Sequence, residues 1–146
     1  MPTVNRAQRG SALILVPICM LLLLSLGGFV IDSATTYYEQ RELNDTANSL
    51  ANRIATKAID LNTYYGSDGQ TIQIDDAKAV QMALTTQNGL SNSYLTDVVI
   101  TPSVNDAVVS IKIAAIAHHV ILRSFPGASN SVPIQATARA ELVRHA

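Results

Sequence analysis

The sequence has no tryptophan, a single cysteine and few charged residues. Cys19 has no second cysteine to pair with, which excludes a disulfide within the chain. Charged side chains make up 14% of the residues, against about 25% in typical soluble domains. Residues 32–146 hold more Asp and Glu than Lys and Arg. A basic surface is therefore not expected, and nucleic acid is not predicted as a partner.

Motifs that carry chemistry are also scarce. The serines have no Gly-x-Ser-x-Gly setting, and the glycines form no phosphate-binding cluster. His118-His119 is the most metal-like pair, but neighbours on a strand point to opposite faces of a sheet. Asp75-Asp76 is explained as a helix cap followed by a first-turn acid. We therefore expect a protein that is not an enzyme, with no cofactor and no metal site.

The shortage of charge is concentrated in Ser11 to Ile31, which contains no charged residue. A helix needs about 20 apolar residues to cross a bilayer, and this segment has that length. Arg6 and Arg9 precede it, and Asp32 follows at once. Positive charge stays on the cytoplasmic side. We therefore expect a cytoplasmic tail at 1–10, a membrane helix at 11–31 and an extracytoplasmic domain at 32–146.

A cleaved secretory signal is the alternative interpretation of this segment. The apolar core of such a signal is usually about 7–15 residues long, shorter than the run observed here. Leu26, Gly27 and Gly28 offer only a weak cleavage site. The length of the run therefore favours a retained anchor.

A second pattern follows the span and predicts that the helix continues to about Leu61. Apolar residues recur at steps of three and four, which marks one face of a helix: Leu43, Ala47, Leu50, Ala51, Ile54, Ala58 and Leu61. We expect the span and this segment to form one helix of about 50 residues, about 75 Å long at 1.5 Å per residue.

The rest of the chain is predicted to be mixed in structure. A turn, a short strand and a helix are expected in that order, at 64–69, 71–74 and 75–87. The last third alternates apolar and polar residues at period two, which is typical of strands with one buried face. Strands are expected at 98–101, 107–117 and 132–142, with a turn at 102–106. The predicted fold class is α+β, a long N-terminal helix packed on a small antiparallel β-sheet, with the 43–61 stripe covering one face.

The order of these features resembles the TadE/TadG-like proteins of the Tad (Flp) pilus-assembly system. Members look like Arg-Gly, a leucine-rich span, Gly-x-x-Val-Asp, a tyrosine and then an alanine-rich helix. The matching positions are Arg9-Gly10, Gly28-Phe29-Val30-Ile31-Asp32, Tyr37, Arg41, Leu43-Asn44, Ala47 and Leu50-Ala51. The match covers about residues 6–55, and the spacing of Asp32, Tyr37, Leu43 and Ala47 is its most specific part.

The resemblance implies a small pseudopilin-like or minor pilin-like member, anchored in the bacterial inner membrane with a structural role. Its partners would be the lipid bilayer, other pilus-assembly membrane proteins or pilin-like subunits, and a prepilin peptidase acting between Gly10 and Ser11. Processed members carry Glu where position 15 here is Leu, so a processed and a retained N-terminus both stay open.

Small residues in the span predict where helix–helix packing would occur, because they allow backbones to approach closely. They include Ser25, Gly27 and Gly28. Asp32 is interpreted as the boundary of the span, with a contact to a neighbouring subunit as its functional alternative. The alternative for the whole chain is an anchored extracytoplasmic binding or adhesion module unrelated to pili.

Overall fold

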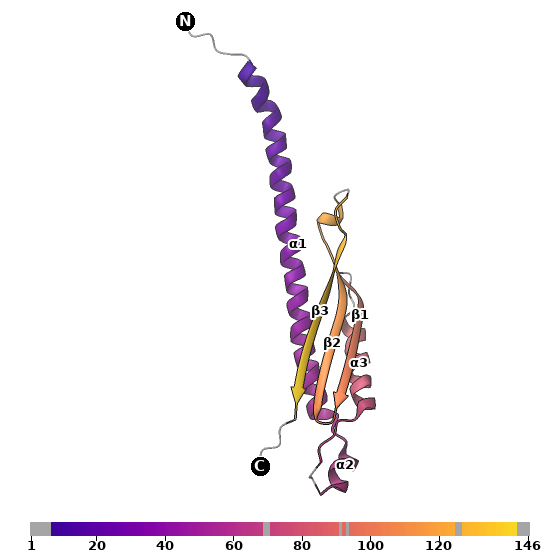
Figure 1. Cartoon of the computed structure of the whole chain (residues 1–146). Coiled ribbons are helices and arrows are strands. Elements are labelled where there is room, and N and C mark those ends of the chain that lie inside the picture. The colour runs from indigo at the N-terminus through magenta and orange to yellow at the C-terminus, as the bar shows by residue number, and fades with distance from the viewer. Residues whose placement is uncertain (1–6, 69–70, 91, 93, 125–126, 143–146) are drawn as a thin grey trace.

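The computed structural model describes residues 7–68, 71–90, 92, 94–124 and 127–142, and at 7–13 only the helical backbone. Its elements are α1 (Ala7–Lys57), α2 (Leu61–Gly66), α3 (Asp76–Leu90), β1 (Leu95–Asn105), β2 (Val108–His118), the short 3₁₀ helix η1 (Leu122–Ser124) and β3 (Ser131–Glu141). The strands form an antiparallel sheet in the order β1-β2-β3 (Figure 1). The predicted α+β class, with one long helix packed on an antiparallel sheet, is confirmed.

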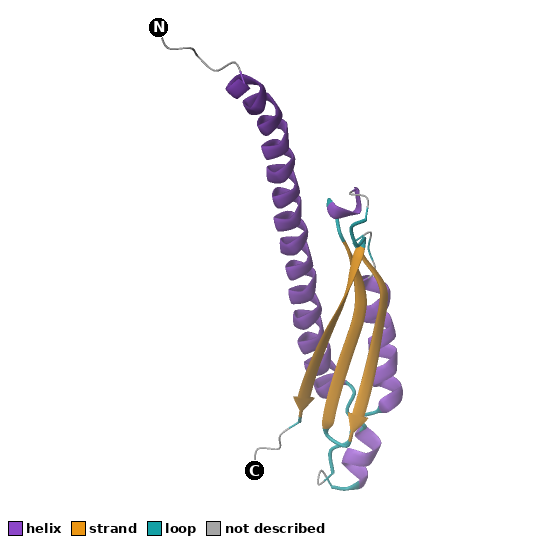
Figure 2. Cartoon of the chain, turned by 45° about the horizontal axis from the view of Figure 1, so that its top comes forward, coloured by secondary structure: helices purple, strands orange, loops and turns teal. Residues whose placement is uncertain are grey.

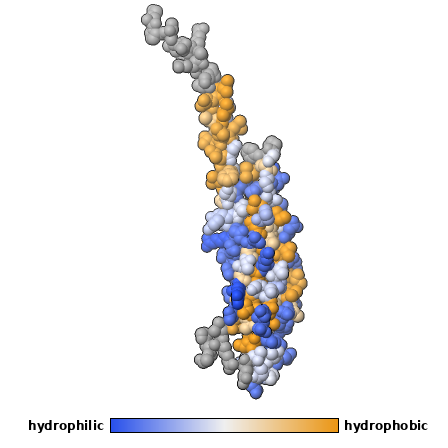
Figure 3. Space-filling view, in the orientation of Figure 1, coloured by the Kyte–Doolittle hydropathy of each residue, from blue (hydrophilic) through white to orange (hydrophobic). Residues whose placement is uncertain are grey.

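Helix α1 divides into two halves with opposite surroundings. Its first half projects beyond the sheet (Figure 1) and presents an apolar surface (Figure 3). Large apolar side chains from Ile14 to Ile31 are about half to two-thirds exposed. The helix continues through Pro17 without a break. By length and composition, this part of α1 is able to cross a membrane.

The second half of α1 forms the core with the sheet. The predicted stripe is buried from Leu43 to Ala58. Both views place α1 along β3 and α3 along β1 (Figures 1 and 2). Alanines at alternate positions of β3 are buried against the helix layer, and their small size lets α1 approach the sheet closely: Ala136, Ala138 and Ala140. The 43–61 stripe was expected to cover this face of the sheet, and α3 covers the part of the face along β1.

The end of α1 differs from the prediction. The helix stops at Lys57, and Leu61 begins the separate helix α2, where its side chain is 55% exposed. The Asp60 carboxylate caps α2 by accepting a 3.0 Å hydrogen bond from the Asn62 amide. Residues 64–66, predicted as a turn, are therefore helical. The strand expected at 71–74 is reduced to one bridge between Ile59 and Ile74.

Strand β1 is longer than predicted. It begins at Leu95 and continues through Pro102 to Asn105, where a turn at 102–106 was expected. The prediction failed because β1 is an edge strand, in which a proline removes no needed ladder bond. Between Thr96 and Val99 the register shifts by one extra residue, and Asp97 takes a positive φ of 52° at this bulge.

Helix α3 begins as predicted. The Asp75 carboxylate accepts hydrogen bonds from the amides of Ala77 (2.9 Å) and Lys78 (3.2 Å), which confirms its role as the cap. The helix ends at Leu90, three residues beyond the predicted end at Gln87. Ala79 and Ala83 face the sheet. The opposite face of the sheet carries no helix from the described part of the chain.

Candidate functional site

The point where the apolar half of α1 meets the sheet domain contains an unusual polar contact. Asp32 is 1% exposed, the one charged side chain that is fully buried among the described residues. Its Oδ1 lies 2.7 Å from the Val120 nitrogen and 3.0 Å from the Ile121 nitrogen. Its Oδ2 lies 2.6 Å from the Leu122 nitrogen and 3.3 Å from that of Ile121. One carboxylate therefore holds three consecutive backbone amides of the connection between β2 and β3.

These hydrogen bonds decide the charge state of Asp32. Burial raises the pKa of the carboxyl, because water no longer stabilises the charged form. The backbone amides of residues 120–122, helped by the nearby His119, outweigh burial and leave the pKa below its ordinary value. Asp32 is therefore ionised at neutral pH. We call residues 119–124 the junction loop, and the carboxylate of Asp32 fixes this loop to α1.

A glycine one helical turn earlier makes the approach of the junction loop possible. A Cβ atom placed on Gly28 would lie 2.9 Å from Cγ2 of Ile121, closer than van der Waals contact allows. Gly28 and Asp32 lie on the same face of α1, since residues four apart are neighbours on a helix. A Cβ atom placed on Gly27 would meet no atom of the described residues within 4 Å. The surface of α1 at Gly28 is therefore covered by the junction loop, whereas the surface at Gly27 is not covered by any described residue.

An apolar hollow lies beside this contact, outside the domain core. Its volume is about 380 Å³, and it is lined by Leu23, Leu24, Gly27, Gly28, Ile31 and Ile121. All but the last belong to the apolar half of α1. The junction loop therefore reaches past Asp32 to the level of the predicted membrane span.

Two adjacent histidines lie where β2 passes into the junction loop. His118 ends the strand, and His119 begins the loop. His118 Nε2 lies 2.8 Å from Oγ1 of Thr96 on β1. The backbone amide of His119 donates to the carbonyl of Asn130 at 3.0 Å, which closes the loop. Nδ1 of His119 is buried and has no hydrogen-bond partner among the described residues. Within residues 7–142 as far as described, no three His, Cys, Asp or Glu side chains gather in a metal-binding group.

Beyond the junction, α1 carries polar contacts to the sheet and an exposed aromatic pair. Nε2 of Gln40 donates to the carbonyl of Gln135 on β3 at 2.8 Å. The rings of Tyr37 and Tyr38 pack edge to face, 6.3 Å apart, and both are about two-thirds exposed. Exposed tyrosines just past a membrane helix are typical of the interface with water.

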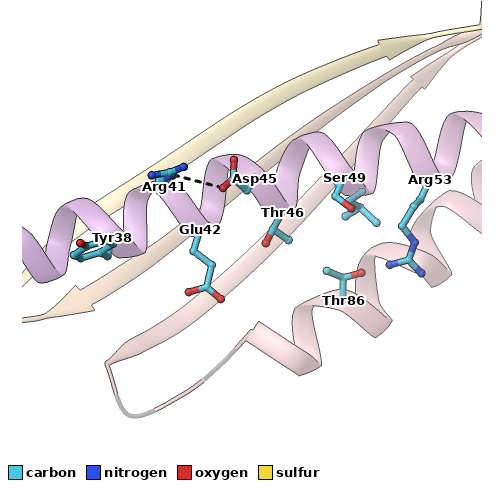
Figure 4. A pocket seen from close by; sticks show the side chains of 9 residues that line it. Tyr38, Arg41, Glu42, Asp45, Thr46, Ser49, Arg53 and Thr86 are labelled. Carbon is cyan, nitrogen blue, oxygen red and sulfur yellow. Dashed lines mark ion pairs between the residues drawn. The ribbon is translucent and has the colours of Figure 1, made fainter.

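A polar groove runs between α1 and α3 (Figure 4), with a volume of about 670 Å³. Arg53 extends from α1 toward Thr86 on α3, and Arg41 and Asp45 form an exposed ion pair of 3.9 Å along α1. Exposed pairs of this kind contribute about 0–1 kcal/mol. The groove contains both signs of charge and is open to solvent, so its chemistry is that of an ordinary protein surface.

Glu39 is half-buried on α1 and follows Tyr38 of this groove in the sequence. Its Oε2 atom is buried without a hydrogen-bond partner among the described residues. Burial, and then the neighbouring Glu42 carboxylate, raise the pKa of Glu39 above its ordinary value. Unlike Asp32, this carboxylate has a buried oxygen with no donor among the described residues, so its ionisation opposes folding.

The residues singled out in the sequence separate into distinct places. The backbone is helical at Gly10 and Ser11, and their side chains lie outside the described residues. Ser25 donates its hydroxyl to the Leu21 carbonyl of its own helix at 2.8 Å. Leu43 and Ala47 are core residues with no exposed surface. Processing at Gly10 and Ser11, and helix packing through Ser25, Gly27 and Gly28, stay predictions.

The junction loop itself was missed at the sequence level. Its hydrogen bonds come from backbone amides, which every residue except proline carries, so no side-chain pattern marks them. The only signals were a lone acid at the end of an apolar run and the apolar triplet at residues 120–122. Neither signal predicts the other, because 88 positions separate Asp32 from Val120.

Comparisons of this chain with models of known protein families, with curated proteins and with solved structures find no match. The junction, the exposed apolar helix and the fold are therefore the features that indicate a function.

Proposed function

We propose that this chain is a single-pass membrane-anchored structural protein, a minor pilin-like or pseudopilin-like component of Tad (Flp) pilus assembly in the bacterial inner membrane. One observation carries the proposal. The same helix is apolar and exposed in its first half and forms the core of an α+β domain in its second half. Water-soluble monomers rarely expose apolar patches of this extent, whereas a bilayer or a neighbouring helix would cover it.

The connection between anchor and domain supports a structural role. No linker separates the two halves of α1, and the Asp32 carboxylate and the Gly28–Ile121 contact hold the junction loop against the helix. A domain fixed this way follows any movement of its membrane helix as one body. This coupling suits a subunit that is packed, pulled or rotated through its helix. An anchored receptor needs no such rigidity.

The orientation follows from charge. Arg6 and Arg9 precede the apolar segment and keep the N-terminus in the cytoplasm. Labelling with an impermeant maleimide tests this, in a Cys19→Ser background that removes the one native cysteine. Tyr65→Cys, on α2, is expected to react in intact spheroplasts, and Asn5→Cys only after permeabilisation. A reversed pattern would overturn the orientation, and recovery of the chain in the soluble fraction would overturn the anchor.

Packing against other subunits is proposed for the uncovered side of the apolar half. Small residues let membrane helices approach closely, and Gly27 has open space around it. A photo-crosslinking amino acid at Gly27 is expected to capture a second membrane helix in cells that make the whole assembly. The same group at Tyr65 serves as the matched control. Equal capture at both positions, or none at Gly27, would contradict a packing role.

Processing decides between two forms of this function. Intact-mass measurement with N-terminal sequencing of protein from its native cells gives the first residue directly. A start at Ser11 would remove both leader arginines and make a filament or pseudofilament role the better account. A start at Met1 or Pro2 would identify a permanent anchor that assists assembly.

A further inference from the structure

We propose that the junction loop is a second membrane-contacting element, which lies beside α1 at the boundary between the lipid headgroups and the hydrocarbon. The inference rests on the proposed function in one respect, namely that residues 11–31 cross a bilayer. It adds that the domain contacts the membrane surface at two places, the helix and this loop. The partner is the lipid bilayer itself, with its phosphate headgroups and the outer ends of its acyl chains.

The junction loop meets α1 inside the apolar segment. Ile121 contacts Gly28, four residues inside the end of the apolar segment at Asp32. Four residues of helix rise about 6 Å. The headgroup region on each side of a bilayer is about 5–7 Å thick. With Asp32 at the edge of the hydrocarbon, Ile121 lies among the outermost acyl carbons. Both views show the connection between β2 and β3 rising beside α1, away from the sheet (Figures 1 and 2).

The side chains of the junction loop also suit a membrane surface. Val120, Ile121 and Leu122 are consecutive apolar residues that are only partly buried, and the exposed Arg123 follows them. Apolar side chains next to a cation suit the membrane interface, where the guanidinium reaches phosphate while its stem stays in apolar surroundings. The 380 Å³ hollow between Ile121 and α1 is apolar and continuous with the lipid-facing surface of the helix. The apolar lining of this hollow suits part of a lipid acyl chain.

The backbone of the junction loop supports the same placement independently of its apolar surface. Irregular backbone is tolerated at membrane depth only where its polar groups find partners within the protein. The three amides of residues 120–122 are bonded to the Asp32 carboxylate. The amide of Ser124 donates to the Ile121 carbonyl at 3.0 Å. A buried aspartate at this depth is thereby explained, because it satisfies the backbone of the segment that would otherwise lose its water.

The chain contains no tryptophan, so one introduced tryptophan is a unique fluorophore. Leu122→Trp places it in the loop at a residue that is already apolar. Ser124→Trp replaces an exposed side chain and keeps the test valid if the first variant disturbs packing. Leu22→Trp, in the middle of the apolar segment, and Tyr65→Trp, 73% exposed on α2, are the matched controls. Each full-length variant is reconstituted in vesicles of phosphatidylcholine and phosphatidylglycerol, with lipids brominated either near the headgroup or deep in the acyl chain.

The expected result is quenching of both loop tryptophans by the shallow bromines and much less by the deep ones. Leu22→Trp should be quenched most by the deep bromines, and Tyr65→Trp by neither. If Leu22→Trp is quenched while both loop variants stay as bright as Tyr65→Trp, the loop does not touch lipid and the inference is wrong, although the anchor stands. A second protein helix covering the hollow would give this same pattern. If Leu22→Trp is also unquenched, the span fails and the inference fails with it.

Discussion

Asp32 and Ile121 are 89 positions apart in the chain, yet the Asp32 carboxylate accepts the Ile121 backbone amide at 3.0 Å, one helical turn from the point where the Ile121 side chain meets Gly28. The two contacts act at the same place, one polar and one steric. Together they join the connection of a β-sheet to a helix that extends into apolar surroundings. The direction of the domain relative to α1 is therefore fixed at the end of the apolar segment.

Removing the charge at Asp32 is expected to release the junction loop. In Asp32→Asn one oxygen becomes an amino group that faces backbone donors, so at least one charge-assisted hydrogen bond is lost. Hydrogen bonds to charged groups contribute about 1.5–3 kcal/mol, and we expect the free energy of unfolding to fall by an amount in that range. Release of the junction loop is measured by hydrogen exchange of the protein in detergent micelles. Peptides that cover residues 119–124 should exchange faster in Asp32→Asn than in wild type. Asp45→Asn, which removes only the exposed pair with Arg41, is the control and should change stability by less than about 1 kcal/mol.

The same contact predicts a pH dependence. The folded pKa of Asp32 lies below its ordinary value. The stability it contributes is therefore complete above the unfolded pKa, about 3.9, and is lost as pH falls through the lower folded value. In a His119→Gln background, the difference in unfolding midpoint between the chains with and without Asp32→Asn should be constant from pH 7 to about pH 5 and shrink below pH 4. The pKa values of Asp60 and Asp75 are also lowered, but both residues are present in the two proteins, so their contributions to the pH dependence cancel in the difference. The His119→Gln background removes the contribution of the nearby histidine. A difference that grows in acid would contradict this assignment.

Gly28 and Ile121 are expected to be coupled. Gly28→Ala places a methyl group against the branched Ile121 side chain, and overpacking of this kind costs about 1–3 kcal/mol. Ile121→Ala alone leaves a void. The double variant puts the methyl of residue 28 near the space that Ile121 vacates, so it should cost less than the sum of the two, by about 0.5–3 kcal/mol. Thermal unfolding followed by circular dichroism gives all three values.

Gly27→Ala is the matched control for this cycle. Nothing lies within 4 Å of its added Cβ, and alanine is the better helix former. It should be neutral or slightly stabilising in the isolated protein. Strict additivity of Gly28→Ala and Ile121→Ala would show that the loop does not pack on the helix at this point.

Periodicity predicted those parts of the fold that bury one regular face. The stripe from Leu43 to Ala58 and the alternation along β2 and β3 depend on side chains that pack against a single layer, and both were found where the pattern placed them. The extent of β1 was missed because Pro102 indicates a turn unless the strand is known to be at an edge. The junction was missed for a different reason. Its donors are backbone amides, and its acceptor is one aspartate that also marks the end of a span.

Glu39 gives the opposite pH dependence to Asp32. Burial, followed by the nearby Glu42, raises its pKa in the folded protein above the ordinary value. The charged form therefore opposes folding, and stability falls as pH rises through the unfolded pKa toward the raised folded one. Glu39→Gln keeps the size of the side chain and removes the charge. It should raise the unfolding midpoint at pH 7 and change it little at pH 4, where the wild-type carboxyl is protonated in the folded protein.

Glu42→Gln, exposed on the same helix, is the control and should raise the midpoint less, because it removes only the repulsion between the two carboxylates. A loss of stability in Glu39→Gln at pH 7 would mean that the carboxylate has a donor, which its present surroundings do not provide among the described residues.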